Sequence, residues 1–203
     1  IIKAARERKV AFITAGDPMS ATTHLDLRLR AVEEGIVTDL INGVSIFTAC
    51  SAALGLQPYK FGRTVTIPLP EQGFLPSSPY ENILENHSRG LHTLILLDIK
   101  AEENRYMTAP MAMQWLMDAE DRIGSGLVKS NSLFCAAARV GSPNQALFAG
   151  YPDEILTVEL GPPLHCMVMP GRLHFMEARG LVTFANAPRD ILDEGGSGSE
   201  SQK

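Results

Sequence analysis

The segment that most constrains the fold is residues 92–99, HTLILLDI, a nearly continuous apolar run. A half-exposed strand alternates apolar and polar residues, whereas an unbroken run is typical of a strand that is covered on both faces. Helix-length segments precede and follow this run in the sequence, and helices are the usual cover of such a strand. We therefore predict an α/β protein in which residues 92–99 form a central strand.

Most of the predicted helices stop at a glycine. Glycine readily adopts the left-handed conformation that ends a helix. We expect helices from about Leu25 to Val32, Ser45 to Ala53, Ser78 to Arg89 and Thr108 to Ile123, with stops at Gly35, Gly55, Gly90 and Gly124, and a last helix from Arg172 to about Phe184.

Further β-rich runs allow a division into domains. We expect strands at residues 9–14, 37–41, 62–69, 132–140, 146–150 and 166–169, with the first two parallel in a β-α-β unit. Two strands are too few for an independent sheet, so the first lobe is expected to be incomplete. The predicted division is residues 1–54 for the remainder of an N-terminal α/β domain, 55–61 for a linker, 62–192 for a C-terminal α/β domain and 193–203 for a disordered Gly/Ser-rich tail.

Composition narrows the class of partner and compartment. The net charge is -5 and the sequence pI is about 5.5, which gives no general attraction to nucleic acid or to an anionic membrane. Apolar runs end well before the roughly 20 residues that cross a bilayer, and no signal peptide opens the chain. Cys50, Cys135 and Cys166 lie far apart in apolar contexts, so we expect reduced buried thiols, no metal site and a cytoplasmic location.

The turn Ala15-Gly16-Asp17-Pro18 after the first expected strand is a candidate ligand site. Ligands of open α/β sheets gather beyond the carboxyl ends of parallel strands. A glycine there lets the backbone approach a ligand, and Asp17 can accept hydrogen bonds from hydroxyl or amino groups. The alternative is that Asp17 only caps the helix that follows.

Longer motifs in a fixed order identify a resemblance. Residues 15–24 (AGDPMSATTH), 56–68 (LQPYKFGRTVTIP) and 89–100 (RGLHTLILLDIK) resemble the diphthine synthases, and the likeness continues through 138–142 (ARVGS), 161–165 (GPPLH) and 170–174 (PGRLH). It covers about residues 9–192, and its last part is closer to the archaeal branch than to the eukaryotic one. The family begins with a glycine-rich strand and turn that does not precede Lys9 here, so we expect an incomplete N-terminal domain.

The resemblance implies a fold, a reaction and a set of site residues. It implies the tetrapyrrole methylase architecture, in which two α/β domains hold S-adenosylmethionine in a cleft between them, as a homodimer. The implied activity is methylation of the amino group of a modified histidine on translation elongation factor 2, which gives diphthine. Carried over by motif, the implied cofactor contacts are Asp17, Ser20, Ser45, Ile46, Leu96, Val140 and His165.

Two other functions stay open at this point. One keeps the fold and methylates a carbon of a porphyrin precursor, although the FGRTVTIP and LLDIK motifs argue against it. The other is a binding module without catalysis. No residue is nominated as a proton-transferring group, because His24, His87 and His174 are more typical of surface or core positions, and only His165 follows a Gly-Pro-Pro turn.

Overall fold

The computed structural model describes residues 1–20, 22–71 and 75–194, and the chain divides into two compact units. The first unit is Ile1–Ala49 and the second is Cys50–Lys203. The division falls inside helix α3 (Ile46–Leu54), ahead of the boundary that we predicted after residue 54.

A five-stranded mixed sheet forms the centre of the second unit, with strand order β1-β2-β7-β5-β6. Strands β1 and β2 are parallel, and every other neighbouring pair is antiparallel. The strands are β1 (Val65–Ile67), β2 (Thr93–Leu97), β5 (Phe134–Ala138), β6 (Ala146–Gly150) and β7 (His165–Met169). The predicted antiparallel pairing of residues 132–140 with 146–150 is confirmed by β5 and β6.

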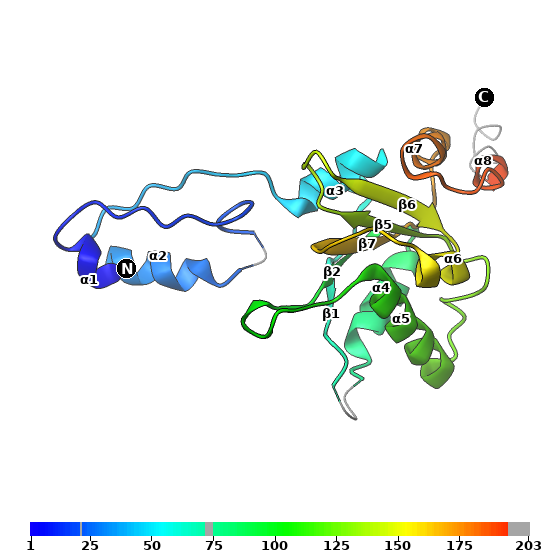
Figure 1. Cartoon of the computed structure of the whole chain (residues 1–203), viewed down its shortest axis with the longest axis horizontal. Helices are drawn as coiled ribbons and strands as arrows, with labels where there is room; N and C mark the ends of the chain where they lie inside the picture. The colour runs from blue at the N-terminus through cyan, green and yellow to red at the C-terminus, as the bar shows by residue number, and fades with distance from the viewer. Residues whose placement is uncertain (21, 72–74, 195–203) are drawn as a thin grey trace. The chain divides into compact units, whose positions relative to one another are not determined.

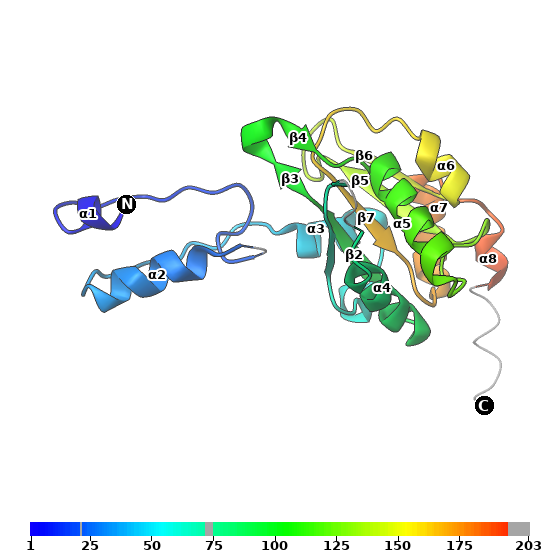
Figure 2. The same ribbon diagram turned by 90° about the horizontal axis from the view of Figure 1, so that it is seen from below.

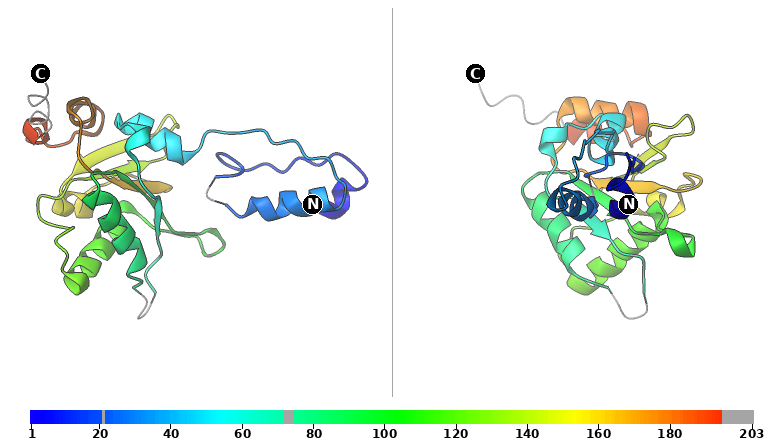
Figure 3. Two further views of the ribbon diagram at one scale, coloured as in Figure 1. Left: turned by 180° about the vertical axis from the view of Figure 1, so that it is seen from behind. Right: turned by 90° about the vertical axis from the view of Figure 1, so that its left-hand side faces the viewer.

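Helices cover both faces of this sheet, as the apolar run at residues 92–99 predicts. On one face lie α4 (Ser78–Ser88), α5 (Ala109–Ile123) and α6 (Pro152–Thr157), and on the other lies α7 (Phe175–Ala185) (Figures 1 and 2). The view from behind shows the same layers (Figure 3). Strand β2 is therefore covered on both sides, and Leu94 and Ile95 are 2% and 0% exposed. Each such aliphatic side chain contributes roughly 1.5–3 kcal/mol through burial.

Local sequence signals explain where the helices of this unit end. Helix α5 stops at Gly124, whose φ of 68° is left-handed, and α4 ends ahead of Gly90, whose φ is 71°. Both stops were predicted. All three cysteines are free and buried, and the Sγ atoms of Cys50 and Cys166 lie 3.5 Å apart.

The first unit contains helices but lacks the strands that the sequence predicts. Helices α1 (Ile2–Ala5) and α2 (His24–Glu33) form, and extended segments join them (Figure 1). Residues 9–14 and 37–41 are not strands among the described residues, so the predicted parallel β-α-β unit is wrong here. A β-strand forms only where a neighbouring strand pairs with its backbone hydrogen-bonding groups. A β-rich sequence pattern indicates that a segment can bury one face, but it does not show that a neighbouring strand is present.

The expected linker lies within the second unit, and most of the expected tail lies outside the described residues. Residues 55–61 contain the 3-10 turn η1 (Pro58–Lys60) and the 3% exposed Leu56, so this segment packs as part of the second unit. Helix α8 (Ile191–Glu194) occupies the start of the expected tail, and residues 195–203 lie outside the described residues.

Three short elements follow β2, and no sequence pattern predicted them. They are β3 (Ile99–Lys100), the 3-10 turn η2 (Ala101–Glu103) and β4 (Arg105–Tyr106), which together make a small antiparallel hairpin. Asn104 turns the chain with a left-handed φ of 51°. Strands this short carry no readable periodicity, which is why residues 99–106 were not predicted as a hairpin.

Candidate functional site

Asp17 organises the turn in the first unit. Its Oδ1 accepts from the Met19 N–H at 2.9 Å and from the Ser20 hydroxyl at 3.1 Å, and its Oδ2 accepts from the Gly43 N–H at 3.2 Å. The hydrogen bond from Met19 is the largest cause that lowers the pKa of Asp17, with smaller contributions from Ser20 and Gly43 against a modest effect of burial. Asp17 therefore acts as an anion that joins the turn to residue 43.

The helix-capping alternative for Asp17 is wrong. Helix α2 has Thr23 as its N-cap, and the N–H groups that Asp17 accepts from belong to Met19 and Gly43 instead. The approach of residue 43 to the turn requires glycine, because a Cβ on Gly43 would overlap the Gly16 carbonyl oxygen. Ser45 and Ile46 follow Gly43 closely in the chain, at the start of α3, where the Ser45 hydroxyl accepts from the Phe47 N–H.

In the second unit, the other predicted residues meet at one edge of the sheet. Leu96 pairs with Cys166 across β2 and β7, and Ala138 pairs with His165 across β5 and β7. Val140 follows β5 by two positions at the same edge. Leu96, Val140 and His165 are each partly exposed, so this edge presents two apolar side chains and one imidazole to a ligand.

The His165 ring is already held by the protein through both nitrogens. Nδ1 accepts from the Ala109 N–H at 3.3 Å, so Nε2 carries the proton and donates to the Gly161 carbonyl oxygen at 3.0 Å. Burial is the largest cause that lowers the pKa of His165, and the nearby Arg139 charge lowers it too, against hydrogen bonds to backbone carbonyls. His165 is thus a neutral residue that fixes the 161–165 loop to the start of α5.

A buried ionic network stabilises the opposite edge of the sheet, and sequence reasoning missed it. Glu177 is 0% exposed and accepts from Lys60 Nζ, from His92 Nε2 at 3.0 Å and from the Gln57 N–H at 2.9 Å. Burial would raise the pKa of Glu177, but the hydrogen bonds from His92, Lys60 and two backbone N–H groups outweigh it and lower the pKa to about 2. The partners are 85 to 120 residues away in sequence, so no local pattern signals the network.

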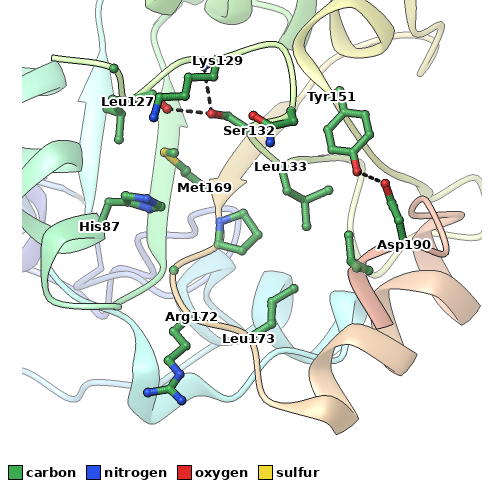
Figure 4. Close-up of a pocket in the computed structure, with 15 residues that line it drawn as sticks. His87, Leu127, Lys129, Ser132, Leu133, Tyr151, Met169, Arg172, Leu173 and Asp190 are labelled. Atoms are coloured by element: carbon green, nitrogen blue, oxygen red, sulfur yellow. Dashed lines mark hydrogen bonds between the residues drawn. The ribbon is translucent and has the colours of Figure 1, made fainter. Parts of the chain in front are cut away.

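A cavity of about 420 Å³ lies at this second edge, away from the predicted site residues. Its wall includes Met169, at the end of β7, and Tyr151, just after β6. Figure 4 shows His87, Lys129, Leu133 and Leu173 around it, and a hydrogen bond of 2.6 Å from the Tyr151 hydroxyl to Asp190. None of the predicted cofactor residues lines this cavity, and those of the second unit, Leu96, Val140 and His165, lie near the start of β7 rather than its end.

The described part of the chain shows neither a metal-binding cluster nor a membrane-spanning helix. Residues 1–20, 22–71 and 75–194 contain no group of three or more His, Cys, Asp or Glu side chains that could hold a metal ion. No helix in these ranges is long and apolar enough to cross a membrane.

Comparison with known proteins agrees with the sheet and with the motifs. The family model of tetrapyrrole (corrin/porphyrin) methylases matches residues 1–154. The chain is 41% identical over 194 residues to the diphthine synthase of Methanosphaera stadtmanae, covering 96% of this chain and 74% of that protein. It is 43% identical over 192 residues to the diphthine synthase of Methanothermobacter thermautotrophicus, covering 95% and 73%.

A solved structure gives the same answer for the fold. A crystal structure of diphthine synthase superposes with a TM-score of 0.83 at 31% identity, covering 95% of this chain and 72% of that one. The likeness thus includes the first unit, where the expected strands are absent, as well as the sheet of the second. The chain belongs to the diphthine synthase family of tetrapyrrole methylases.

Proposed function

We propose that this chain transfers methyl groups from S-adenosylmethionine to the amino group of the modified histidine of elongation factor 2. As a member of the diphthine synthase family it is an S-adenosylmethionine-dependent methyltransferase of diphthamide biosynthesis. The observation that carries the proposal is the 41% identity over 194 residues. That span includes both the Asp17 turn and the edge formed by Leu96, Val140 and His165.

The Asp17 turn has the capacity to bind the polar part of the cofactor. A carboxylate offers about four acceptor positions, and Asp17 uses three of them for Met19, Ser20 and Gly43. A hydroxyl or ammonium group of the cofactor can join or replace one of these donors, and the lowered pKa of Asp17 keeps the carboxylate charged. We infer that Asp17, Ser20, Ser45 and Ile46 contact the cofactor.

The edge of the second unit suits the apolar part of the same molecule. Leu96 and Val140 present aliphatic surface, which an adenine ring or a thioether chain can cover. His165 is neutral and has both ring nitrogens engaged, so we infer that it contacts the cofactor through its backbone or ring face. S-adenosylmethionine supplies an electrophilic methyl group on a sulfonium.

Methyl transfer depends mainly on the relative positions of the amine and the methyl donor. With S-adenosylmethionine bound, the amine nitrogen would form a bond to the methyl carbon as the carbon–sulfur bond breaks, and the sulfur would keep the electron pair as a thioether. The nitrogen would lose a proton to solvent after the first and the second transfer, whereas the third would form a quaternary ammonium that has no proton to lose. Alignment of two reacting atoms supplies much of the rate in such a displacement, and a neutral amine needs no strong base. Three such transfers give a trimethylammonium product.

The partner, assembly and location follow as further proposals. We infer that the protein substrate is elongation factor 2, that the enzyme works as a homodimer, and that it is cytoplasmic. The net charge of -5 favours a protein partner over nucleic acid, and three free buried thiols suit a reducing compartment.

The test is a transfer assay with labelled S-adenosylmethionine and elongation factor 2 that carries the aminocarboxypropyl-histidine. We expect label on the modified factor and none on the unmodified factor. A porphyrinogen offered in competition should stay unlabelled. Cofactor binding without transfer to the modified factor would overturn the proposal in favour of a binding module, and label on the porphyrinogen alone would favour a carbon methyltransferase.

A further inference from the structure

Arg139 follows β5 directly and has an unusual backbone conformation. Its φ of 50° lies in the left-handed region, which is unfavourable for a residue that carries an ordinary side chain. Its N–H donates to the Leu164 carbonyl oxygen at 3.0 Å, and its carbonyl accepts from the Ser142 N–H at 3.0 Å. Surrounding contacts therefore hold Arg139 in a conformation that it would not adopt alone.

The Arg139 guanidinium joins two separate loops. Nε donates to the Asn144 carbonyl oxygen at 3.0 Å, Nη2 donates to the Leu160 carbonyl oxygen at 2.7 Å, and Nη1 donates to the Pro162 carbonyl oxygen. A guanidinium has five N–H groups in a rigid fork, so it can hold several carbonyls in fixed directions. The turn between β5 and β6 and the loop between α6 and β7 are thereby tied to one side chain.

Gly161 fits beneath this guanidinium, and His165 holds the same loop from its other end. A Cβ on Gly161 would lie 3.4 Å from Nη2 and 3.5 Å from Nη1 of Arg139, and the φ of Gly161 is 76°. The His165 ring donates to the Gly161 carbonyl oxygen and accepts from the Ala109 N–H. Residues 160–165 are thus fixed between Arg139 and the first residue of α5.

We propose that Arg139 is a positioning residue that holds the 160–165 loop and the end of β5 in the arrangement that binds S-adenosylmethionine. The inference rests on the proposed function, because Val140 and His165 are the cofactor contacts that Arg139 flanks. Val140 is the next residue in the chain, and His165 follows Leu164, whose carbonyl accepts the Arg139 N–H. Loss of the guanidinium removes its bonds to the Asn144, Leu160 and Pro162 carbonyls while the backbone bond to Leu164 stays, and we expect it to loosen the loop that leads to His165 and the turn that follows Val140.

The chain offers a matched control in Arg122. It lies in α5, and its Nη1 also donates to a loop carbonyl oxygen, that of Leu75, at 3.0 Å. Arg122 is near the end of α5, whereas His165 binds the start of the same helix. If both arginines only fasten loops, substitution of either should lower the melting temperature to a similar extent. Only substitution of Arg139 should weaken the binding of S-adenosylmethionine.

The experiment measures the Kd for S-adenosylmethionine by calorimetric titration, together with the melting temperature. Arg139→Asn removes the guanidinium and keeps a residue that tolerates a left-handed φ. We expect its Kd to rise about tenfold, as the loss of charge-assisted hydrogen bonds would give. Arg139→Lys keeps the charge without the forked guanidinium, so its Kd should lie between those of the unaltered chain and Arg139→Asn. Arg122→Gln should leave the Kd unchanged. In the transfer assay Arg139→Asn should raise the KM for S-adenosylmethionine with little change in kcat.

The outcomes separate this inference from the proposed function. No binding by the unaltered chain would defeat the proposed function. Binding by the unaltered chain that is equally strong in folded Arg139→Asn would overturn the positioning role alone. Should Arg139→Asn fail to fold, Arg139→Lys and Gly161→Ala decide: a raised Kd in both supports the role, and an unchanged Kd in both refutes it.

Discussion

The two units of this chain carry similar sequence patterns and reach different structures. In the second unit the β-rich runs pair into a sheet, and Ile67, Ile95 and Met167 are 0% exposed. In the first unit the runs at residues 9–14 and 37–41 stay extended without pairing, and Ile13, Val37 and Ile41 are 88%, 90% and 86% exposed. Burial therefore follows the neighbouring strand and not the apolar pattern by itself.

This difference teaches how stability is distributed between the units. Hydrophobic burial scales with apolar area that is removed from water, and the second unit has nearly all of the buried side chains. Among the buried hydrophobic residues of the described chain, only Ala31 belongs to Ile1–Ala49. The second unit should hence resist unfolding by itself, while the first is fixed by the Asp17 turn and by surface ion pairs.

The largest expected effect is a core truncation. Ile95→Ala in β2 removes a fully buried side chain and should lower the free energy of unfolding by about 4 kcal/mol, from lost burial and from the cavity left behind. The matched change Ile13→Ala in the first unit, at an 88% exposed position, should change it by less than about 0.5 kcal/mol. Urea unfolding checks both, and equal effects would break the comparison between the units.

Next in size is removal of the buried acid. Glu177→Gln leaves Lys60 and His92 without their charged partner and should cost about 3 kcal/mol in urea unfolding. Glu34→Gln in the first unit breaks a pair with Arg6 in which the arginine side chain is 61% exposed, and should cost about 1 kcal/mol or less. If Glu34→Gln lowered the free energy of unfolding as much as Glu177→Gln, the assignment of Glu177 as buried and Glu34 as exposed at the surface would be contradicted.

The same acid predicts a pH dependence. The pKa of Glu177 is about 2 in the folded chain and 4.5 as its ordinary value, so its ionised form stabilises the fold by about 3 kcal/mol. Because the folded pKa is the lower one, this stability is present above about pH 4.5 and is lost as the pH falls through about 2. The difference in unfolding free energy between the unaltered chain and Glu177→Gln should shrink over that interval. A difference that stays constant from pH 6 to 2 would refute the prediction.

The smallest expected effect concerns the turn of the first unit. Gly43→Ala places a Cβ against the Gly16 carbonyl and should break the hydrogen bond from the Gly43 N–H to Asp17. We expect the Kd for S-adenosylmethionine to rise several-fold, by roughly 1 kcal/mol for one hydrogen bond to a charged group, with little change in the unfolding of the second unit. Gly35→Asn is the control, because no atom lies within 4 Å of the Gly35 Cβ position, asparagine tolerates its left-handed φ of 73°, and Gly35 is far from Asp17 in sequence. Equal binding by both variants would count against a role for the turn.

The sequence predicted those parts of the structure whose cause is local. The stop of α5 follows from the left-handed Gly124, and α4 begins at Ser78 with Pro79 in its first turn as predicted, although its N-cap is Ser77 and no side chain caps it. The apolar run at 92–99 predicts its own burial. The predicted strands at 9–14 and 37–41 did not form, because pairing depends on a neighbour that periodicity cannot reveal.

The candidate site was predictable only through motifs. Asp17 and His165 stand in the AGDP and GPPLH motifs, and the structure places Leu96, Val140 and His165 at one edge. Arg139 lies in the ARVG motif, but its positive φ and its three carbonyl partners, up to 23 residues away, become visible only in three dimensions. Lys60, His92 and Gln57 bind Glu177 from more than 80 residues away, so only its capping bond with the His174 N–H has a local cause.

Amide hydrogen exchange with and without S-adenosylmethionine tests most directly whether both units contribute cofactor contacts. The account predicts that the cofactor slows exchange at residues 16–20 of the first unit and at residues 139–142 and 161–165 of the second, while the cavity wall near Leu133 and Leu173 is unchanged. Slowed exchange in the second unit alone, or around that cavity instead, would contradict it.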